Sequence, residues 1–323
     1  MENYSPFSSR LEEQITSLSE TELISRIRDW LGDACPQAPE GIGDDCAVRK
    51  ADFPGQYLLT TVDGVGWGTH FDHQVPPEMA GRKLLARNLS DIASMGGKPL
   101  QAVVSLWLAP QVSLDWLQRF YTGLKELALA YDVAIVGGDV SSAAEGVLIA
   151  DLCLQGICEQ PLLRQQVGAG DSLWVTGELG GSREGKHVSF LPRLAEGQWL
   201  RQSSWAKSMI DVSDGLAKDL PALVGGSCVK VSALPISEAA CNIAKTSDNT
   251  ALYHAINDGE DYELLFAVDA DRDPEGLLRE WKQHFNIPLT QIGVVESRTA
   301  DGSFQWVDEK GESKDVGRGY EHF

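Results

Sequence analysis

The chain has 323 residues, more than one hydrophobic core usually supports, so we expect two domains of roughly 150 residues each. Its 47 acidic side chains outnumber its 27 basic ones and give a formal net charge of −20. Such a surface repels the phosphates of nucleic acids and anionic membranes, so neither is an expected partner.

The composition also indicates where the protein works. Residues 1–20 carry charges throughout and lack the apolar core of a signal peptide. No stretch approaches the roughly 18 consecutive apolar residues of a membrane-spanning helix. The six cysteines lie apart, without a Cys-X-X-Cys pair, which argues against a zinc ribbon or a disulfide framework. We therefore expect a soluble, cytoplasmic protein.

Segments of helical and strand period alternate along the first half. The segments expected as strands are residues 57–65, 101–108, 133–136 and 147–158. Residues 77–95 predict a helix that starts near Pro77 and ends before two glycines. A second helix is expected after Ser113, whose side chain suits an N-cap.

The boundary between the two domains is placed near residue 160, which gives domains of residues 1–160 and 161–323. In the second domain, strands are expected at residues 172–176, 228–233, 262–268, 291–295 and 304–307, and helices after Ser213 and at 274–285. This mixture fits either an α/β or an α+β arrangement, and the spacing alone does not distinguish them.

One short pattern recurs along the chain: glycines beside the end of a strand, with an aspartate presented next to them. Its occurrences are Asp44-Asp45, Asp63-Gly64, Gly138-Asp139, Asp214-Gly215 and Asp258-Gly259-Glu260-Asp261, and Asp91 stands in a related setting. A single Asp-Gly pair is more often a turn than a ligand, but the repetition favours a shared role. Asp91 is the most informative, because it falls within a predicted helix, where Asp has no propensity advantage.

Converging carboxylates imply cations, because two of them about 4 Å apart repel by about 1–4 kcal/mol. Hard oxygen ligands without a Cys or His cluster favour Mg²⁺ over zinc. Mg²⁺ held by carboxylates and by substrate phosphates is the usual arrangement of kinases, in which positioning and charge neutralisation supply most of the acceleration.

In their order and spacing these motifs resemble those of the thiamine-monophosphate kinase family over nearly the whole chain. The matching motifs are Gly-Ile-Gly-Asp-Asp at 41–45, Asn-Leu-Ser-Asp at 88–91, Gly-Gly-Asp at 137–139, Asp-Val-Ser-Asp-Gly at 211–215, Gly-Glu-Asp-Tyr-Glu at 259–263 and Gly-Tyr-Glu-His-Phe at 319–323. The resemblance implies the two-domain aminoimidazole ribonucleotide synthetase-like fold, of mixed α/β (α+β) class. In that fold the N-terminal domain binds ATP and Mg²⁺, its sheet pairs across a homodimer, and a C-terminal α/β domain follows.

The resemblance further implies in-line transfer of the γ-phosphoryl group of ATP to thiamine monophosphate, giving thiamine diphosphate. The residues that match Mg²⁺ ligands are Asp45, Thr61, Asp63, Asp91, Asp139, Asp211 and Asp214, with Asp91, Asp139 and Asp214 taken as catalytic. The residues that match ATP-binding positions are Gly138, Asp139, Arg164 and Ser213. His70 and Glu260 match positions that bind the acceptor.

Some positions depart from the family pattern and keep alternatives open. Val62 and Val140 stand where hydroxyl-bearing residues are usual, and Gly317 stands where an aromatic residue that packs on the substrate is expected. A different small phosphate-containing acceptor on the same fold, as in the related aminoimidazole ribonucleotide synthetases, is therefore one alternative. A non-catalytic nucleotide-binding homologue is another, and the retained carboxylates disfavour it.

Two ATP-dependent relatives are less compatible with this sequence. Selenophosphate synthetase and the hydrogenase-maturation dehydratase use a reactive cysteine or selenocysteine, at the N-terminus and the C-terminus respectively. Here the first cysteine is Cys35, and the chain ends in Phe323.

Two local patterns have simpler interpretations than their first appearance suggests. Residues 180–187 come within one residue of the phosphate-binding pattern GxxxxGK[ST], with His187 in place of the hydroxyl, and we expect a glycine-rich loop entering a helix. His70 and His73 could suggest a metal site, but no third soft ligand is near in sequence. We expect His70 to be a neutral hydrogen-bond partner of the substrate.

Overall fold

The computed structural model describes residues 5–18, 20–36, 57–308, 310–314, 317 and 319. The chain separates into two compact units. The first unit comprises Met1–Ile92 and Lys98–Glu159, and the second comprises Ala93–Gly97 and Gln160–Phe323. The assignment of ATP binding and dimerisation to residues 1–160 stays a prediction.

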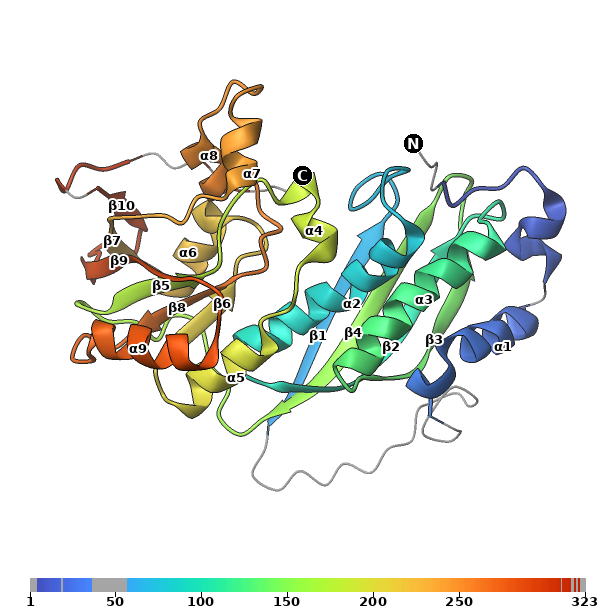
Figure 1. Cartoon of the computed structure of the whole chain (residues 1–323), viewed down its shortest axis with the longest axis horizontal. Coiled ribbons are helices and arrows are strands. Elements are labelled where there is room, and N and C mark those ends of the chain that lie inside the picture. The colour runs from blue at the N-terminus through green and yellow to red at the C-terminus, as the bar shows by residue number, and fades with distance from the viewer. Residues whose placement is uncertain are drawn as a thin grey trace. The chain divides into compact units, whose positions relative to one another are not determined.

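The elements of the first unit are drawn from blue to green in Figure 1. They are η1 (Leu11–Glu13), η2 (Ile15–Ser17), α1 (Glu20–Leu31), η3 (Gly32–Ala34), β1 (Tyr57–Gly66), α2 (Pro77–Ser94), β2 (Lys98–Leu108), α3 (Leu114–Ala130), β3 (Ala134–Ser142) and β4 (Leu148–Cys158). The last residues of α2 belong to the second unit.

The second unit continues in yellow to red. Its elements are β5 (Ser172–Thr176), η4 (Ser182–Glu184), α4 (Lys186–Ser189), α5 (Leu194–Gln202), β6 (Ser208–Asp211), α6 (Leu216–Val224), β7 (Ser227–Val231), α7 (Glu238–Ile243), α8 (Ala251–Asn257), β8 (Leu264–Val268), α9 (Pro274–His284), β9 (Leu289–Arg298) and β10 (Gln305–Val307).

The sheet of the first unit has the strand order β1-β4-β2-β3, in which β4 is antiparallel to both neighbours and β2 is parallel to β3. Helices α2 and α3 cover one face of it (Figure 1). Side chains along β2 and β4 alternate between a buried and an exposed face, as the two-residue period of a strand requires. Four exposed apolar side chains lie on the same side of the sheet, Val62 (63%), Val103 (39%), Trp107 (46%) and Ile149 (41%), and we call this side the outer face.

Helices α2 and α3 approach each other closely because glycines stand at their crossing. A Cβ added at Gly81 would lie 1.9 Å from the carbonyl oxygen of Phe120, and one added at Gly123 would lie 1.9 Å from that of Glu78. Neither backbone oxygen can move aside without bending its helix. The two glycines therefore set the distance between the helices, and with it the position of α2 over β1.

We predict that Gly123→Ala destabilises the protein by about 2 kcal/mol, because the overpacking cost exceeds the gain in helix propensity. Gln118→Ala, at an exposed position of the same helix, is the control and should change stability by less than about 0.5 kcal/mol. Urea denaturation of both variants measures the effect. A more stable Gly123→Ala protein would contradict the close crossing.

The sheet of the second unit has the order β10-β7-β9-β5-β8-β6 and is antiparallel except for the pair β10-β7. Its central strands β5 and β8 are buried at every position. Leu173 and Leu265 belong to the core shared with α6 and α8. The next residue on each strand, Trp174 and Phe266, is also buried and points to the opposite face of the sheet. The sheet is thus covered on both sides.

The mixed α and β fold expected from the sequence is confirmed, and antiparallel neighbours predominate in both sheets. The helix expected at residues 77–95 is α2, and Ser113 caps α3 as expected, its Oγ accepting the Trp116 N–H at 3.4 Å. Within the described part of the chain, no helix is both long and apolar enough to cross a membrane.

Candidate active site

The predicted site residues are divided between the two units. Those in the first unit are Thr61, Asp63, His70, Asp91, Gly138 and Asp139, and those in the second are Arg164, Asp211, Ser213, Asp214 and Glu260. Asp45 lies outside the described residues, as does the rest of the motif at 41–45.

In the first unit, β1 and α2 bring three of the predicted metal ligands together. The Thr61 hydroxyl donates to Asp91 Oδ2 at 2.5 Å, which joins the strand to the helix. Asn88 Oδ1 accepts the Asp63 N–H at 3.1 Å, while its Nδ2 donates to the Leu84 carbonyl oxygen. These contacts fix β1 against α2 at the position of Thr61, Asp63 and Asp91.

Arg87 is a member of this cluster that the sequence interpretation missed. Its guanidinium pairs with Asp63 Oδ1 at 2.9 Å and also donates to the Gly64 carbonyl oxygen. Its side chain is only 12% exposed, so the pair is partly shielded from water. Its position four residues before Asp91, on the same helical face, was the available signal.

Asp139 does not join this cluster within the first unit. It pairs in register with Ser105 of β2, between Val103 and Trp107, and therefore points to the outer face. Its strand β3 and the strand β1 are opposite edges of the sheet, about 14 Å apart at the usual strand spacing. Thr61 and Asp63 lie on the other face of the sheet, where they contact Asp91 and Arg87 of α2.

On the outer face Asp139 borders a cavity of about 520 Å³. Gly138, which the family resemblance assigns to ATP, and Asp151 of β4 line it as well. Asp151 was not predicted. It faces Gly64 of β1, where an added Cβ would lie 2.1 Å from the Asp151 carboxylate and would displace it.

His70 follows β1 and folds back onto its end. Its Nδ1 accepts the Gly66 N–H at 3.1 Å, and buried Lys83 donates to its carbonyl oxygen at 3.0 Å. With Nδ1 acting as an acceptor, a neutral imidazole carries its proton on Nε2. The expected role of His70 as a neutral hydrogen-bond partner of the substrate is compatible with this geometry and stays a prediction.

In the second unit the site residues stand on residues 212–215, which connect β6 to α6 and which we call the aspartate loop. Asp211, the last residue of β6, is 4% exposed. Ser213 and Asp214 are partly buried on the loop. Lys218, in the first turn of α6, pairs with Asp214 Oδ2 at 2.5 Å.

Asp219 anchors the aspartate loop and was also missed. Its buried Oδ2 accepts the backbone N–H groups of both Ser213 and Asp214, each at 3.0 Å. Burial raises the pKa of Asp219 to about 7, and the nearby Asp214 charge acts in the same direction. Like Asp91, it is an aspartate inside a helix, and that was the available signal.

A second loop, residues 258–263, packs against the aspartate loop and holds it from the other side. The Glu260 N–H donates to the Ser213 carbonyl oxygen at 2.7 Å, and the Tyr262 N–H donates to that of Val212 at 2.8 Å. Glu260 and Tyr262 have φ values of 57° and 50°. Left-handed backbone at two non-glycine residues is unfavourable, which indicates that the surrounding contacts impose this path.

Asp261, between those two residues, is buried with 1% exposure. Its Oδ1 accepts the Gly180 N–H at 2.8 Å and the Ser182 hydroxyl at 2.5 Å. Its Oδ2 has no hydrogen-bond partner among the described residues. Burial raises the pKa of Asp261 to about 7.

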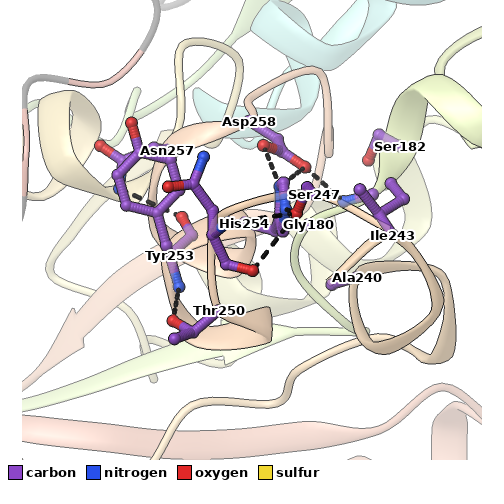
Figure 2. Close-up of polar contacts among 12 residues, drawn as sticks. Gly180, Ser182, Ala240, Ile243, Ser247, Thr250, Tyr253, His254, Asn257 and Asp258 are labelled. Atoms are coloured by element: carbon purple, nitrogen blue, oxygen red, sulfur yellow. Dashed lines mark hydrogen bonds and ion pairs between the residues drawn. The ribbon is translucent and has the colours of Figure 1, made fainter. Parts of the chain in front are cut away.

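The neighbouring Asp258 fixes the end of α8 to the backbone of Gly181, next to Gly180 (Figure 2). It accepts the Gly181 N–H at 3.0 Å, and His254 Nδ1 lies 2.9 Å from its Oδ1. On its other side His254 Nε2 lies 2.8 Å from Ser247 Oγ. This chain of contacts orders the polar side of α8.

The segment 180–187 forms the glycine-rich loop that was expected, leading into η4 and α4. Lys186, which would bind phosphate in a P-loop, pairs with buried Glu263 at 2.9 Å. His187 Nδ1 lies 3.5 Å from Glu260 Oε2. The loop thus borders Glu260, one of the two predicted acceptor-binding residues.

Among the described residues, no three His, Cys, Asp or Glu side chains are close enough to hold a metal ion. The predicted Mg²⁺ ligands are divided between the two units, and Asp45 lies outside the described residues. The metal array therefore stays a prediction.

Asp261 gives a prediction for the pH dependence of stability. Its pKa of about 7 in the folded protein exceeds the value near 4 of an unfolded Asp. The protonated carboxyl therefore contributes to the free energy of unfolding at low pH, and this contribution is lost as the pH rises through 7. We expect Asp261→Asn to gain stability relative to the wild type between pH 5 and pH 8, by on the order of 3 kcal/mol.

Urea unfolding at both pH values measures this change. Asp248→Asn, at an exposed loop position, is the control and should show no such gain. An equal difference between Asp261→Asn and the wild type at pH 5 and pH 8 would contradict a raised pKa.

Comparisons with known proteins define the class first. Residues 43–158 match the family described as AIR synthase related protein, N-terminal domain. The crystal structure of thiamine-monophosphate kinase from Stenotrophomonas maltophilia K279a matches with a TM-score of 0.72 and 30% identity, over 92% of this chain and 98% of that one. The chain thus has the AIR synthase-like fold.

The particular family follows from sequence identity. The thiamine-monophosphate kinase of Rhodopirellula baltica is 38% identical over 275 residues, which is 82% of this chain and 85% of that relative. A structure of AaThiL complexed with AMPPCP and TMP matches with a TM-score of 0.69 and 27% identity, over 98% of this chain and 100% of that one. The chain belongs to the thiamine-monophosphate kinase family and is a kinase, which confirms the resemblance seen in its sequence.

Proposed function

We propose that this kinase transfers the γ-phosphoryl group of ATP to thiamine monophosphate, forming thiamine diphosphate and ADP. The observation that carries the proposal is the 38% identity to a thiamine-monophosphate kinase over 82% of this chain. The match to AaThiL complexed with AMPPCP and TMP supports the same pair of substrates, because AMPPCP is an ATP analogue.

The proposed Mg²⁺ ligands are Asp45, Thr61, Asp63, Asp91, Asp139, Asp211 and Asp214. The donor set fits Mg²⁺, because it consists of carboxylate and hydroxyl oxygens, and Thr61 and Asp91 already lie side by side. When bound, Mg²⁺ neutralises charge between the triphosphate and the anionic acceptor. Asp91, Asp139 and Asp214 are the ligands proposed to act closest to the reacting groups.

The protein residues in this proposal bind and orient the two substrates. Gly138, Asp139, Arg164 and Ser213 bind ATP, and Asp219 holds Ser213 in place through the backbone of the aspartate loop. An oxygen of the acceptor phosphate attacks the γ-phosphorus in line, and the bond from that phosphorus to the ADP oxygen breaks. The attacking oxygen is already anionic near neutral pH, so no general base is needed.

His70 and Glu260 are proposed to bind the acceptor. Glu260 is held by a left-handed backbone and by its contact with His187, so its carboxylate is positioned before the substrate arrives. Preorganised groups of this kind lose little entropy on binding.

A different phosphate-containing acceptor is the second candidate, and position 317 favours it. Gly317 has φ +83°, and a Cβ there would lie 2.3 Å from Asn257 Oδ1. The aromatic side chain expected at this position therefore does not fit the backbone. The acceptor must be recognised by other residues in this chain.

Incubation of the purified protein with ATP, MgCl₂ and thiamine monophosphate should give thiamine diphosphate, detected by chromatography, and EDTA should abolish its formation. Asp91→Asn should lower the rate by at least about 100-fold, because a full negative charge is lost beside the reacting groups. Asp248→Asn, an exposed change, should keep the wild-type rate.

Each contrary outcome has its own meaning. Full activity of Asp91→Asn would exclude this residue as a ligand. ATP binding by the wild type without any thiamine diphosphate would favour the second candidate acceptor.

We also propose that the enzyme is a cytoplasmic homodimer in which the outer faces of two copies meet. The outer face exposes Val62, Val103, Trp107 and Ile149 on one side of the sheet, and grouped exposed apolar side chains are typical of an interaction surface. The described cysteines are free thiols, in keeping with a reducing compartment.

Trp107→Glu should weaken the dimer by about 100-fold in Kd, because it buries a charge where a large aromatic side chain is lost. Analytical ultracentrifugation over a concentration series measures the change. Leu129→Glu, at an exposed position of α3 away from the outer face, should leave the dimer intact. Equal dimerisation of all three proteins would exclude the outer face as the interface.

A further inference from the structure

The second unit contains a cavity of about 600 Å³ that no predicted site residue explains. Its lining combines the exposed side of α8 with the edge of the sheet at β7 and β10, and we call it the ring cavity. Its main lining residues are Leu252, Tyr253, Ile256, Asn257, Trp306 and Gly317. Its volume lies within the range of about 300–1,000 Å³ typical of small-molecule sites.

The lining is mainly apolar and aromatic. Leu252 and Tyr253 are 49% and 44% exposed, although large apolar side chains are normally buried, and the cavity is also lined by Trp306, which is 6% exposed. Lys314 is the basic side chain of the lining, and it is already paired with Asp308 at 3.0 Å. The ring cavity therefore suits a flat, largely apolar group better than a phosphate.

Helix α8 is held in the orientation that presents Tyr253 to the cavity. Figure 2 shows Tyr253 and Asn257 together on one side of α8, while His254 and Asp258 lie on the side of Gly180. Asn257 Nδ2 donates to the Tyr253 carbonyl oxygen at 3.1 Å, and its Oδ1 accepts the Gly319 N–H at 3.2 Å.

The ring cavity and the aspartate loop share a wall. Ile256 lines the cavity, and its carbonyl oxygen lies 2.9 Å from a Cβ added at Gly215 of the aspartate loop. Gly319, bonded to Asn257, packs against the Asp214 carbonyl oxygen, 2.8 Å from an added Cβ. A ligand in the cavity therefore lies next to the loop that carries a proposed metal ligand.

We propose that the ring cavity binds the planar heteroaromatic ring of the phosphate acceptor, stacked against Tyr253. The proposal rests on the proposed function, and it identifies the residue that replaces the aromatic side chain excluded at position 317. Gly317 opens the cavity, and Tyr253 supplies the aromatic face from a different element. Thiamine monophosphate has two linked heteroaromatic rings, one of them cationic, and both properties favour a tyrosine face.

The adenine of ATP is the other heteroaromatic ring available, and the position of the cavity favours the acceptor. Asn257 stands three residues before Glu260, the residue proposed to bind the acceptor. The residues proposed for ATP, Gly138, Asp139, Arg164 and Ser213, do not line the ring cavity.

The test separates the two rings by steady-state kinetics with each substrate varied in turn. Tyr253→Leu should raise KM for thiamine monophosphate about 10-fold, the loss expected for one stacking contact, with kcat and KM for ATP within about twofold of wild type. Tyr253→Phe keeps the ring and should restore the wild-type KM. Leu191→Ala, at an exposed position outside the cavity, is the matched control. Because Tyr253 is partly exposed, we expect Tyr253→Leu to fold like the wild type, and a thermal melt of both proteins checks this.

The contrary results are distinct. A rise in KM for ATP instead would assign the cavity to adenine, and no change in either KM would exclude a substrate there. Calorimetric titration with thiamine, which has the rings without the phosphate, should show binding to the wild type that Tyr253→Leu weakens about 10-fold. If the wild type does not phosphorylate thiamine monophosphate, the proposed function fails, and this titration still decides whether the cavity binds the rings. Failure of thiamine to bind would overturn the proposal.

Discussion

The candidate site of the second unit depends on one buried carboxylate. Asp219 accepts two backbone N–H groups of the aspartate loop, those of Ser213 and Asp214, and so fixes the path of the loop that carries them. An unpaired buried N–H costs about 1–3 kcal/mol, so loss of this acceptor would release the loop from its path. The loop at 258–263 braces it from the other side through two further backbone hydrogen bonds. A similar arrangement holds the first unit, where Asn88 fixes the backbone of Asp63.

Much of the fold could be predicted because long elements have a clear period. The helix at 77–95 and the strands at 57–65 and 147–158 correspond to α2, β1 and β4. Helices α1, α5, α7 and α8 were not predicted. The last three have nine, six and seven residues and complete few turns on which a period could be detected. The short β6 strand was hidden for the same reason, although the aspartate that ends it belonged to a recognised motif.

The site could be predicted only as far as its motifs extend. Ligand-type residues beside glycines are visible in the sequence, and Thr61 and Asp91 do meet. The placement of Asp139 on the opposite face of the sheet could not be predicted, because it depends on strand order and register. Arg87 and Tyr253 carry no motif, and only the tertiary structure shows that Arg87 lies beside Asp63 and that Tyr253 lines the ring cavity.

Three of the described acidic side chains of the candidate site have partners within the chain itself. Arg87 balances Asp63, Lys218 balances Asp214, and Thr61 donates to Asp91. These contacts offset part of the repulsion among the carboxylates, whereas small zinc domains depend on their metal to fold. A cation that binds here must compete with a guanidinium and an ammonium group, which weakens its resting affinity. If the proposed Mg²⁺ site is correct, this competition would favour an ion that arrives together with the nucleotide.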